Sequence, residues 1–154
     1  MKVGDIMTKE VLVVREDDPL LDVARTISEK GFHAIPVVDE TGRLAGIITE
    51  SNFFTASTKE FNLSAYIGLL RVLRNPDAMT ERQKDDFAML RHATAKDIMV
   101  TDCATIVPED ELEVLLELIR ERQFNSIPVT DGNRRVVGIV TTKDALVALS
   151  SPGA

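Results

Sequence analysis

The chain carries one sequence pattern twice, with the copies offset by 92 positions. Without a gap, 16 of the 49 positions in 5–53 are identical to their partners in 97–145, which chance does not explain. A duplication constrains the fold strongly, because whatever one copy forms the other must form as well. The best-matched segments are Asp5–Met7 with Asp97–Met99, Ile35–Val37 with Ile127–Val129, and Gly46–Thr49 with Gly138–Thr141.

Each copy predicts the same order of elements: a short helical turn, a β-rich stretch, a helix, two strands joined by a tight turn, and a second helix. A strand pair joined by so short a turn is a hairpin. The proline in the first strand of each hairpin lacks an N–H, so it is expected to mark an irregular point or an edge. The predicted turns and strands are Val3–Met7, Val11–Arg15 and Ala34–Val38 in the first copy, and Ala95–Met99, Thr105–Val107, Ser126–Thr130 and Val136–Val140 in the second.

The first helix of each copy has an apolar stripe at helical spacing. In the first copy we expect Asp18 to cap this helix and Pro19 to occupy its first turn. The stripe residues are Leu20, Val23, Ala24 and Ile27 in the first copy, and Leu112, Leu115, Leu116 and Ile119 in the second.

Thr141 lies where a buried strand turns into a helix whose apolar side is predicted to hold Ala145, Leu146 and Leu149. A helix start has free backbone N–H groups that attract anions. Thr141-x-x-Asp144 is equally an ordinary capping box, which closes a helix and binds nothing. The two interpretations are compatible, because the same threonine can serve both.

Residues 59–93 separate the copies and are not rich in Gly, Pro or Ser, so they do not resemble a flexible linker. Apolar residues at helical spacing over 63–73, a breaker at Asn75-Pro76-Asp77 and a Thr80-x-x-Gln83 capping box predict a helical hairpin. Its apolar stripe, which includes Phe87 and Leu90, is expected to pack on the core, on a second subunit or on a partner. We assign 1–58 to the first repeat, 59–93 to a helical insertion and 94–150 to the second repeat.

The composition of the chain argues against several classes of function. The net charge is −7 and basic residues are scattered, which argues against nucleic-acid binding. No apolar run is long enough to span a bilayer, and Met1–Asp5 lacks the apolar core of an export signal. The single cysteine fits a reducing compartment, so we expect a cytoplasmic protein. His33 and His92 lie far apart in the sequence and no His/Cys cluster has zinc spacing, so no metal site is expected.

Together, Asp-Ile-Met, Ile-Pro-Val-x-Asp and Gly-hydrophobic-x-Thr-x-x-Asp resemble the CBS domain, present here as a tandem pair. The resemblance covers about 1–58 and 94–150, and it leaves the long insertion unexplained. It implies an α/β (α+β) fold of two β-α-β-β-α repeats packed about a pseudo-twofold axis, with ligand clefts between them. Many such pairs bind AMP, ADP, ATP or S-adenosylmethionine, and such pairs usually form homodimers.

Carried over to the second repeat, the resemblance assigns Asp144 to the ribose hydroxyls and Thr141 to phosphate. A carboxylate accepts both donors of a cis-diol, and Lys143 adds a positive charge near the phosphate. The remaining expected contacts are Asn125 and Ser126 at ribose or phosphate, and Ile127, Pro128, Thr105 and Ile106 as adenine walls.

The first repeat has Asn52 in place of aspartate, and an amide is a weaker diol acceptor. Glu50 places a negative charge on the first helical turn, which disfavours phosphate. His33 replaces Asn125 and would meet phosphate if protonated, although a satisfied, half-buried histidine is the simpler expectation. We therefore expect a weaker or empty first site, at His33, Ala34, Ile35, Pro36, Thr49 and Asn52.

Two function classes remain. The first is a regulatory module that senses adenosine-containing ligands and signals occupancy to an unidentified effector protein. The second is a structural module for dimerisation or assembly, in which both Thr-x-x-Asp/Asn segments are only caps. An enzyme is not expected, because the second copy has no histidine, Cys103 has no base beside it in sequence, and the chain has no P-loop.

Overall fold

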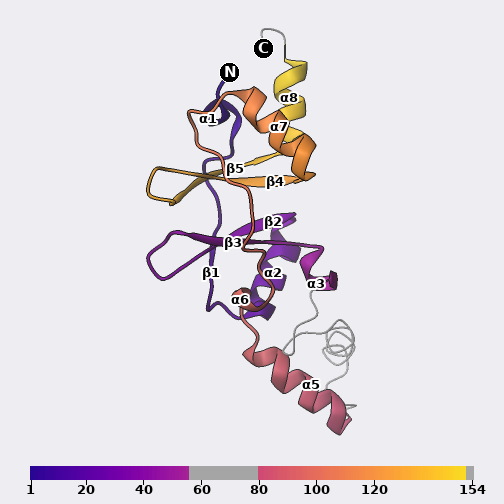
Figure 1. The fold of residues 1–154 in the computed structure, drawn as a ribbon. Helices are drawn as coiled ribbons and strands as arrows, with labels where there is room; N and C mark the ends of the chain where they lie inside the picture. Colours follow the sequence, from indigo (N-terminus) through magenta and orange to yellow (C-terminus); the bar gives the residue numbers. More distant parts are fainter. Residues whose placement is uncertain (56–79, 152–154) are drawn as a thin grey trace.

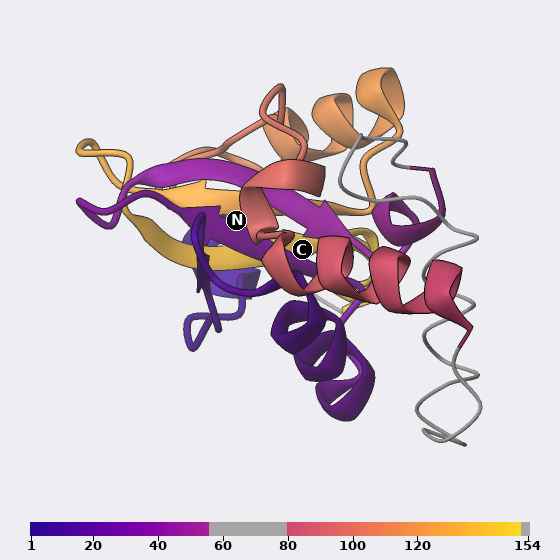
Figure 2. The same cartoon turned by 90° about the horizontal axis from the view of Figure 1, so that it is seen from below.

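The computed structural model describes residues 1–55 and 80–151 as two stacked units, each with a small sheet covered by helices (Figure 1). The lower unit has a three-stranded sheet in the order β1 (Val14–Arg15), β2 (Ala34–Val38) and β3 (Leu44–Thr49). The upper unit has a two-stranded sheet of β4 (Ser126–Thr130) and β5 (Val136–Thr141). The two sheets lie one above the other at the centre, with α2 (Leu20–Lys30) below and α7 (Leu112–Arg122) and α8 (Thr142–Ser150) above (Figures 1 and 2). The predicted fold class is confirmed.

The first repeat contains α1 (Val3–Ile6), β1 (Val14–Arg15), α2 (Leu20–Lys30), β2 (Ala34–Val38), β3 (Leu44–Thr49) and α3 (Asn52–Thr55). The second contains α6 (Ala95–Ile98), α7 (Leu112–Arg122), β4 (Ser126–Thr130), β5 (Val136–Thr141) and α8 (Thr142–Ser150). Where the second copy was expected to have its β-rich stretch, one bridge joins Ile106 to Val129.

The hairpin prolines pair within both ladders, and an irregular point lies close to each. β4 is an edge strand of its two-stranded sheet, as its proline predicted, whereas β2 is the central strand of the other sheet. Pro36 pairs with Ile47 and Pro128 with Ile139, and the register shift comes one residue later in each strand pair. Ile47 exchanges its backbone hydrogen bonds with Val100, on the side away from β2. Pro36 therefore sits at a non-hydrogen-bonded pair, where a missing N–H costs no bond to β3.

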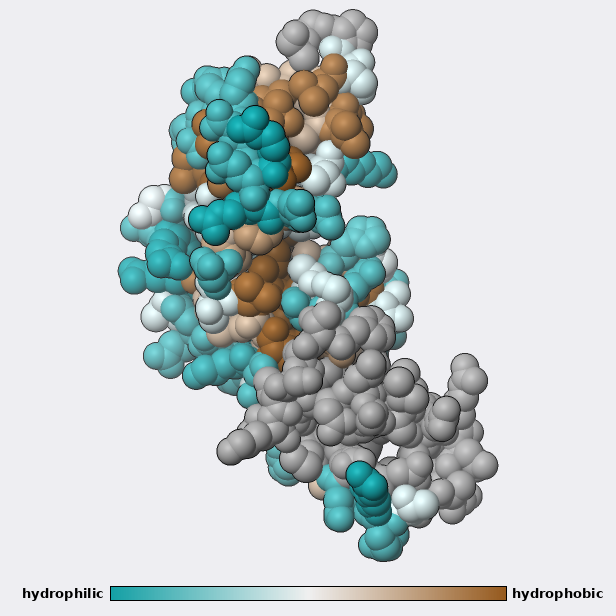
Figure 3. Space-filling model, turned by 45° about the vertical axis from the view of Figure 1, so that its right-hand side comes forward, coloured by the Kyte–Doolittle hydropathy of each residue, from teal (hydrophilic) through white to brown (hydrophobic). Residues whose placement is uncertain are grey.

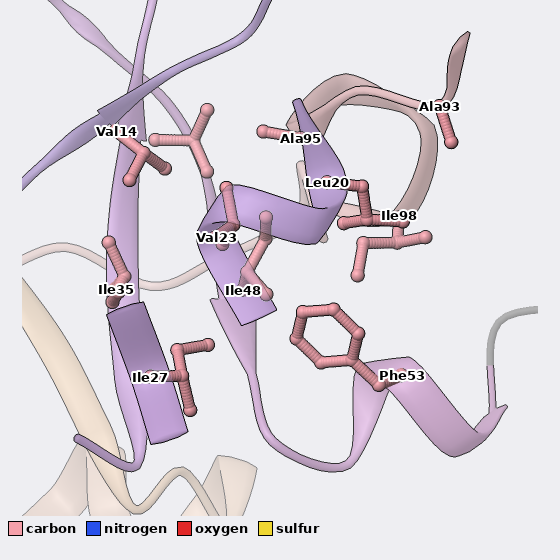
Figure 4. Packing of buried hydrophobic residues seen from close by; sticks show 11 residues of the cluster. Val14, Leu20, Val23, Ile27, Ile35, Ile48, Phe53, Ala93, Ala95 and Ile98 are labelled. Carbon is pink, nitrogen blue, oxygen red and sulfur yellow. The ribbon is translucent and has the colours of Figure 1, made fainter. Parts of the chain in front are cut away.

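Each repeat packs its N-terminal segment into the other repeat's core. Val3, with no exposed surface, belongs to the core cluster of the second repeat, and Ile6 and Met7 pack against that cluster. In exchange, Ala93, Ala95 and Ile98 pack near Leu20 and Phe53 in the core of the first repeat (Figure 4). Neither core is complete without residues from the other repeat, which explains why the pattern occurs as a pair.

The cap of α2 also differs from the prediction. Asp18 does not cap the helix, because its carboxylate accepts the N–H of Arg15 at 2.8 Å in the preceding turn. Pro19 occupies the N-cap position without a side-chain cap bond. The N–H of Leu20 donates instead to the carbonyl of Ala93 at 2.9 Å. A donor at the helix start is thus satisfied by a carbonyl at the end of the insertion, which local spacing does not reveal.

Two glycines mark where the exchanged segments approach the strands most closely. A Cβ on Gly46 would lie 2.7 Å from the carbonyl oxygen of Val100, and one on Gly138 would lie 2.5 Å from the sulfur of Met7. Because real side chains do not tolerate such distances, the repeated glycine is a packing requirement of the exchange.

In the insertion, α5 (Glu81–His92) begins directly after Thr80, as its predicted capping box indicated, and contacts α2. The expected helix over 63–73 lies outside the described residues, as do the side chains of Phe87 and Leu90. No helix in the described ranges is long and apolar enough to cross a membrane.

Candidate functional site: a cleft between the two repeats

A cleft of about 830 Å³ lies between the repeats and takes its walls from both. This volume is in the range of small-molecule sites. Figure 3 shows apolar surface in the hollow between the upper and lower units. The residues that line the cleft are His33, Ile47, Thr49, Glu50, Ser51, Asn52, Val100, Cys103, Ala104, Gln123, Phe124, Asn125, Ser126, Thr141, Thr142 and Lys143.

On the second repeat's side, Thr141 and Asp144 form a complete capping box at the start of α8. The Asp144 Oδ2 atom accepts the Thr141 N–H at 2.8 Å and the Thr141 hydroxyl at 2.7 Å. The Asp144 N–H in turn donates to the Thr141 hydroxyl oxygen at 3.2 Å. The hydroxyl proton is therefore already engaged, whereas Asp144 Oδ1 makes no hydrogen bond within the described part of the chain and remains an acceptor.

On the first repeat's side, the cap geometry is reproduced with an amide. The Asn52 Oδ1 atom accepts the Thr49 N–H at 2.7 Å and the Thr49 hydroxyl at 3.0 Å. Because a backbone N–H can only donate, the oxygen of Asn52 must face Thr49. The Nδ2 group, which makes no hydrogen bond to any described residue, is then the part of the side chain left for other contacts.

His33 and Glu50 form a pair at the mouth of the cleft, with Nδ1 and Oε1 2.9 Å apart. The His33 side chain is 83% exposed, so the expectation of a half-buried histidine is wrong. Its backbone carbonyl accepts the Glu50 N–H, leaving the ring outside the core. When the ring is protonated, this pair offsets the negative charge that Glu50 brings to the cleft.

Cys103 lies in the cleft wall on the segment that follows α6. Burial raises the pKa of its thiol above the ordinary value, and the positive charge of Arg134 offsets only part of that effect. The thiol is therefore a poor nucleophile near neutral pH, which argues against covalent chemistry at this wall.

Seven of the predicted site residues line this cleft: His33, Thr49, Asn52, Asn125, Ser126, Thr141 and Lys143. Five others are not in its lining and are buried in the sheets or beneath them: Ile35, Pro36, Ile106, Ile127 and Pro128. Ala34, Thr105 and Asp144 also fall outside the lining, although Asp144 is hydrogen-bonded to Thr141, which lines it.

Sequence reasoning missed the apolar part of the wall, made of Ile47, Val100, Ala104 and Phe124. Val100 is a large hydrophobic residue that stays 37% exposed. No local sequence signal marked it, because its place in the wall depends on its backbone pairing with Ile47.

Comparison with known proteins decides the family. The CBS domain model matches residues 3–59 and 95–151, which together cover most of the chain. This chain belongs to the CBS domain family. It carries the domain twice, as the repeat predicted.

Three CBS proteins are similar to this chain. The uncharacterized protein MJ1225 of Methanocaldococcus jannaschii is 31% identical over 94% of this chain. Its crystal structure superposes with a TM-score of 0.73 over 97% of this chain and 48% of that one, and this chain spans only 45% of the relative's length. CBSX2 of Arabidopsis thaliana was crystallised in complex with AMP, at 21% identity and a TM-score of 0.69 over 96% of this chain and 95% of that one.

The CBS domain pair of protein MJ0100 was crystallised with 5′-methylthioadenosine and S-adenosyl-L-methionine. It is 21% identical to this chain, with a TM-score of 0.65 over 97% of this chain and 95% of that one. At such identities, the CBSX2 and MJ0100 structures support the shared fold.

Proposed function

We propose that this chain is a non-catalytic regulatory module that binds one class of ligand, an adenosine-containing molecule, in the cleft between its CBS repeats. The observation that carries the proposal is the free acceptor on Asp144, held by the Thr141 cap next to a cleft with apolar and polar walls. The cap fixes the carboxylate before any ligand arrives, so little side-chain entropy is lost on binding.

The cleft has the chemistry that such a ligand requires. Val100, Ala104 and Phe124 offer apolar surface for a purine, and Lys143 offers a charge for phosphate. The AMP complex of CBSX2 and the S-adenosylmethionine complex of MJ0100 support the adenosine class by analogy of fold. AMP, ADP, ATP and S-adenosylmethionine are therefore the ligands to test first.

A thermal-shift panel of these four ligands tests the proposal. A ligand at 100 times its Kd adds about 2.7 kcal/mol, which raises the Tm of a domain of this size by roughly 5–10 °C. The matched variant is Asp144→Asn, because Asn52 shows that an amide oxygen preserves the cap. We expect a shift in the wild type and a greatly reduced one in the variant. No shift from any ligand at millimolar concentration would contradict the proposal.

Asp144→Ala is the harsher test, since it removes the ribose acceptor and the cap together. It is expected to abolish ligand binding and to lower the free energy of unfolding by about 1 kcal/mol through the lost cap. Binding that survives in both Asp144 variants would show that the ribose assignment is wrong.

The alternative function is a structural assembly module, and one observation favours it. Both capping segments are complete without a ligand, since each threonine N–H already has its side-chain acceptor. Under this alternative the chain still assembles, but the four ligands leave its Tm unchanged.

Under either function we expect a homodimer that uses the outer face of α8. Leu146, Val147 and Leu149 are 66%, 57% and 54% exposed, and Figure 3 shows apolar surface gathered over this helix. The buried side of α8 is formed by Ala145 and Ala148, which leaves Leu146 and Leu149 exposed although their spacing groups them with Ala145. Small residues there let the helix lie close to α1 and α7.

Light scattering at high micromolar concentration checks the dimer. We expect the wild type to be dimeric and Leu146→Glu to be monomeric, because a charge cannot be buried unpaired in an apolar interface. Lys143→Glu, on the same helix but in the cleft, is the control and should remain dimeric. A monomeric wild type would rule the dimer out.

A further inference from the structure

The two sides of the cleft present opposite hydrogen-bonding groups. Asp144 and Asn52 are equivalent residues, and each uses one oxygen to accept from the threonine three positions earlier. What remains is an acceptor, Oδ1, on Asp144 and a donor, Nδ2, on Asn52. A ligand that spans the cleft therefore meets an acceptor at one end and a donor at the other.

We propose that Asn52 makes the first repeat's side of the cleft a phosphate subsite rather than a second ribose site. The chain then binds one nucleotide, with its ribose hydroxyls on Asp144 and its phosphate between Asn52 and Lys143. This inference rests on the proposed function, because it assumes that Asp144 holds the ribose.

The charges around Asn52 are compatible with an anion. Lys143 lines the same cleft, and its ammonium makes no salt bridge to any carboxylate of the described residues. Glu50 is a carboxylate among the residues that line the cleft, and its Oε1 is held 2.9 Å from the ring of His33. The Glu50 carboxylate is thus held against the imidazole of His33. Asn52 and Lys143 supply hydrogen-bond donors for the phosphate.

A ribose at Asn52 would be poorly held. Both hydroxyls of a cis-diol donate best to one carboxylate, whereas the group of Asn52 that has no partner among the described residues is itself a donor. The amide therefore favours phosphoryl oxygens, which only accept. This difference predicts that the chain distinguishes nucleotides from nucleosides through the first repeat.

Isothermal titration with AMP and with adenosine tests the subsite in the wild type and in Asn52→Asp. The substitution keeps the oxygen that caps Thr49, so the fold is preserved, and it changes only the free donor into a charged acceptor. We expect the wild type to bind one AMP per chain, more tightly than adenosine. In Asn52→Asp, AMP should bind at least about tenfold more weakly through like-charge repulsion, while the Kd for adenosine changes less than about twofold.

Two results would overturn the subsite and leave the proposed function standing. One is a wild type that binds two AMP molecules per chain, which would mean that Asn52 holds a second ribose. The other is an Asn52→Asp variant that binds AMP as tightly as the wild type, which would mean that Asn52 does not contact the phosphate. Asp144→Asn separates the two proposals. It should weaken the binding of AMP and of adenosine equally, because both ligands carry the ribose and only AMP carries the phosphate. If the wild type binds neither AMP nor adenosine, the subsite fails, and the thermal-shift panel of all four ligands decides whether the proposed function fails with it.

Discussion

At the scale of single residues, the repeated glycines show most clearly what duplication preserves. The Gly46→Ala substitution places a methyl group against the backbone carbonyl of Val100, which cannot move aside as a flexible side chain can. We expect it to lower the free energy of unfolding by about 1–3 kcal/mol, the usual cost of overpacking. Urea unfolding measures this cost.

The matched control is Gly132→Ala. Nothing lies within 4 Å of a Cβ at Gly132, and its backbone has no positive φ. The control should change the free energy of unfolding by less than about 0.5 kcal/mol. Equal effects of the two substitutions would show that Gly46 is not a close-approach position.

Cys103 provides an intrinsic probe of the cleft. Since burial raises its thiol pKa above 9.0, alkylation by a maleimide or iodoacetamide should be slow at neutral pH and still accelerate above pH 9. A bound ligand should slow the reaction further, because the thiol lies in the cleft wall. Mass spectrometry follows the rate, and a rate that levels off below pH 8 would contradict the direction of the shift.

At the scale of elements, the β2–β3 turn is held by one carboxylate. Asp39 Oδ1 accepts the Thr41 hydroxyl at 2.6 Å, the Thr41 N–H at 2.8 Å and the Arg43 N–H at 3.0 Å. The Thr41 hydroxyl, followed by the Arg43 N–H, holds the pKa of Asp39 below its ordinary 3.8. A carboxyl with a lowered folded-state pKa stabilises the fold above its unfolded value, and this stability is lost as the pH falls through the folded value.

Asp39→Asn tests this dependence, because it removes the charge and retains one oxygen. The wild type should have the higher Tm at pH 6, and the two Tm values should converge below about pH 3. Circular dichroism melts over this pH range give the measurement. Glu40→Gln, in the same turn, should show no such convergence, and a constant Tm difference for Asp39→Asn would refute the role of its charge.

Element types were predictable from the sequence because each is set by local patterns. Ala34–Val38 and Ser126–Thr130 are continuous apolar runs, and both form the strands that were predicted. The cap of α2 was not predictable, because the group that accepts from Leu20 is the carbonyl of Ala93, remote in the sequence. The outward face of α8 was missed because Leu146, Leu149 and the alanines all count as apolar, and only the packing separates them.

For the candidate site, too, features set by local sequence were predictable and features set by packing were not. The polar residues at the two helix starts were found from the duplicated motif, and most of them line the cleft. Its apolar wall was missed because Val100 and Phe124 come together only when the repeats stack. The free donor on Asn52 was also hidden, since the orientation of an amide depends on the hydrogen bond that it makes to Thr49.

At the scale of the whole molecule, the exchanged N-terminal segments should make the described repeats unfold together. Val3 is fully buried in the second repeat's core although it belongs to the first. Val3→Ala should lower the free energy of unfolding by about 2–3 kcal/mol. Calorimetry should still show one transition, because loss of either core removes part of the other.

Val13→Ala is the control, since Val13 is 37% exposed and its truncation should cost little. Two separate calorimetric transitions, in the wild type or in Val3→Ala, would show that the repeats are independent units.

The most direct measurement of the central claim is a thermodynamic cycle between Asp144 and the ligand's ribose. AMP and its 2′,3′-dideoxy analogue are titrated into the wild type and into Asp144→Asn. If Asp144 holds the diol, removing both hydroxyls weakens binding to the wild type by at least about tenfold, or 1.4 kcal/mol, and leaves binding to the variant nearly unchanged. The same loss in both proteins would mean that the diol is recognised elsewhere, and the ribose assignment to Asp144 would be wrong.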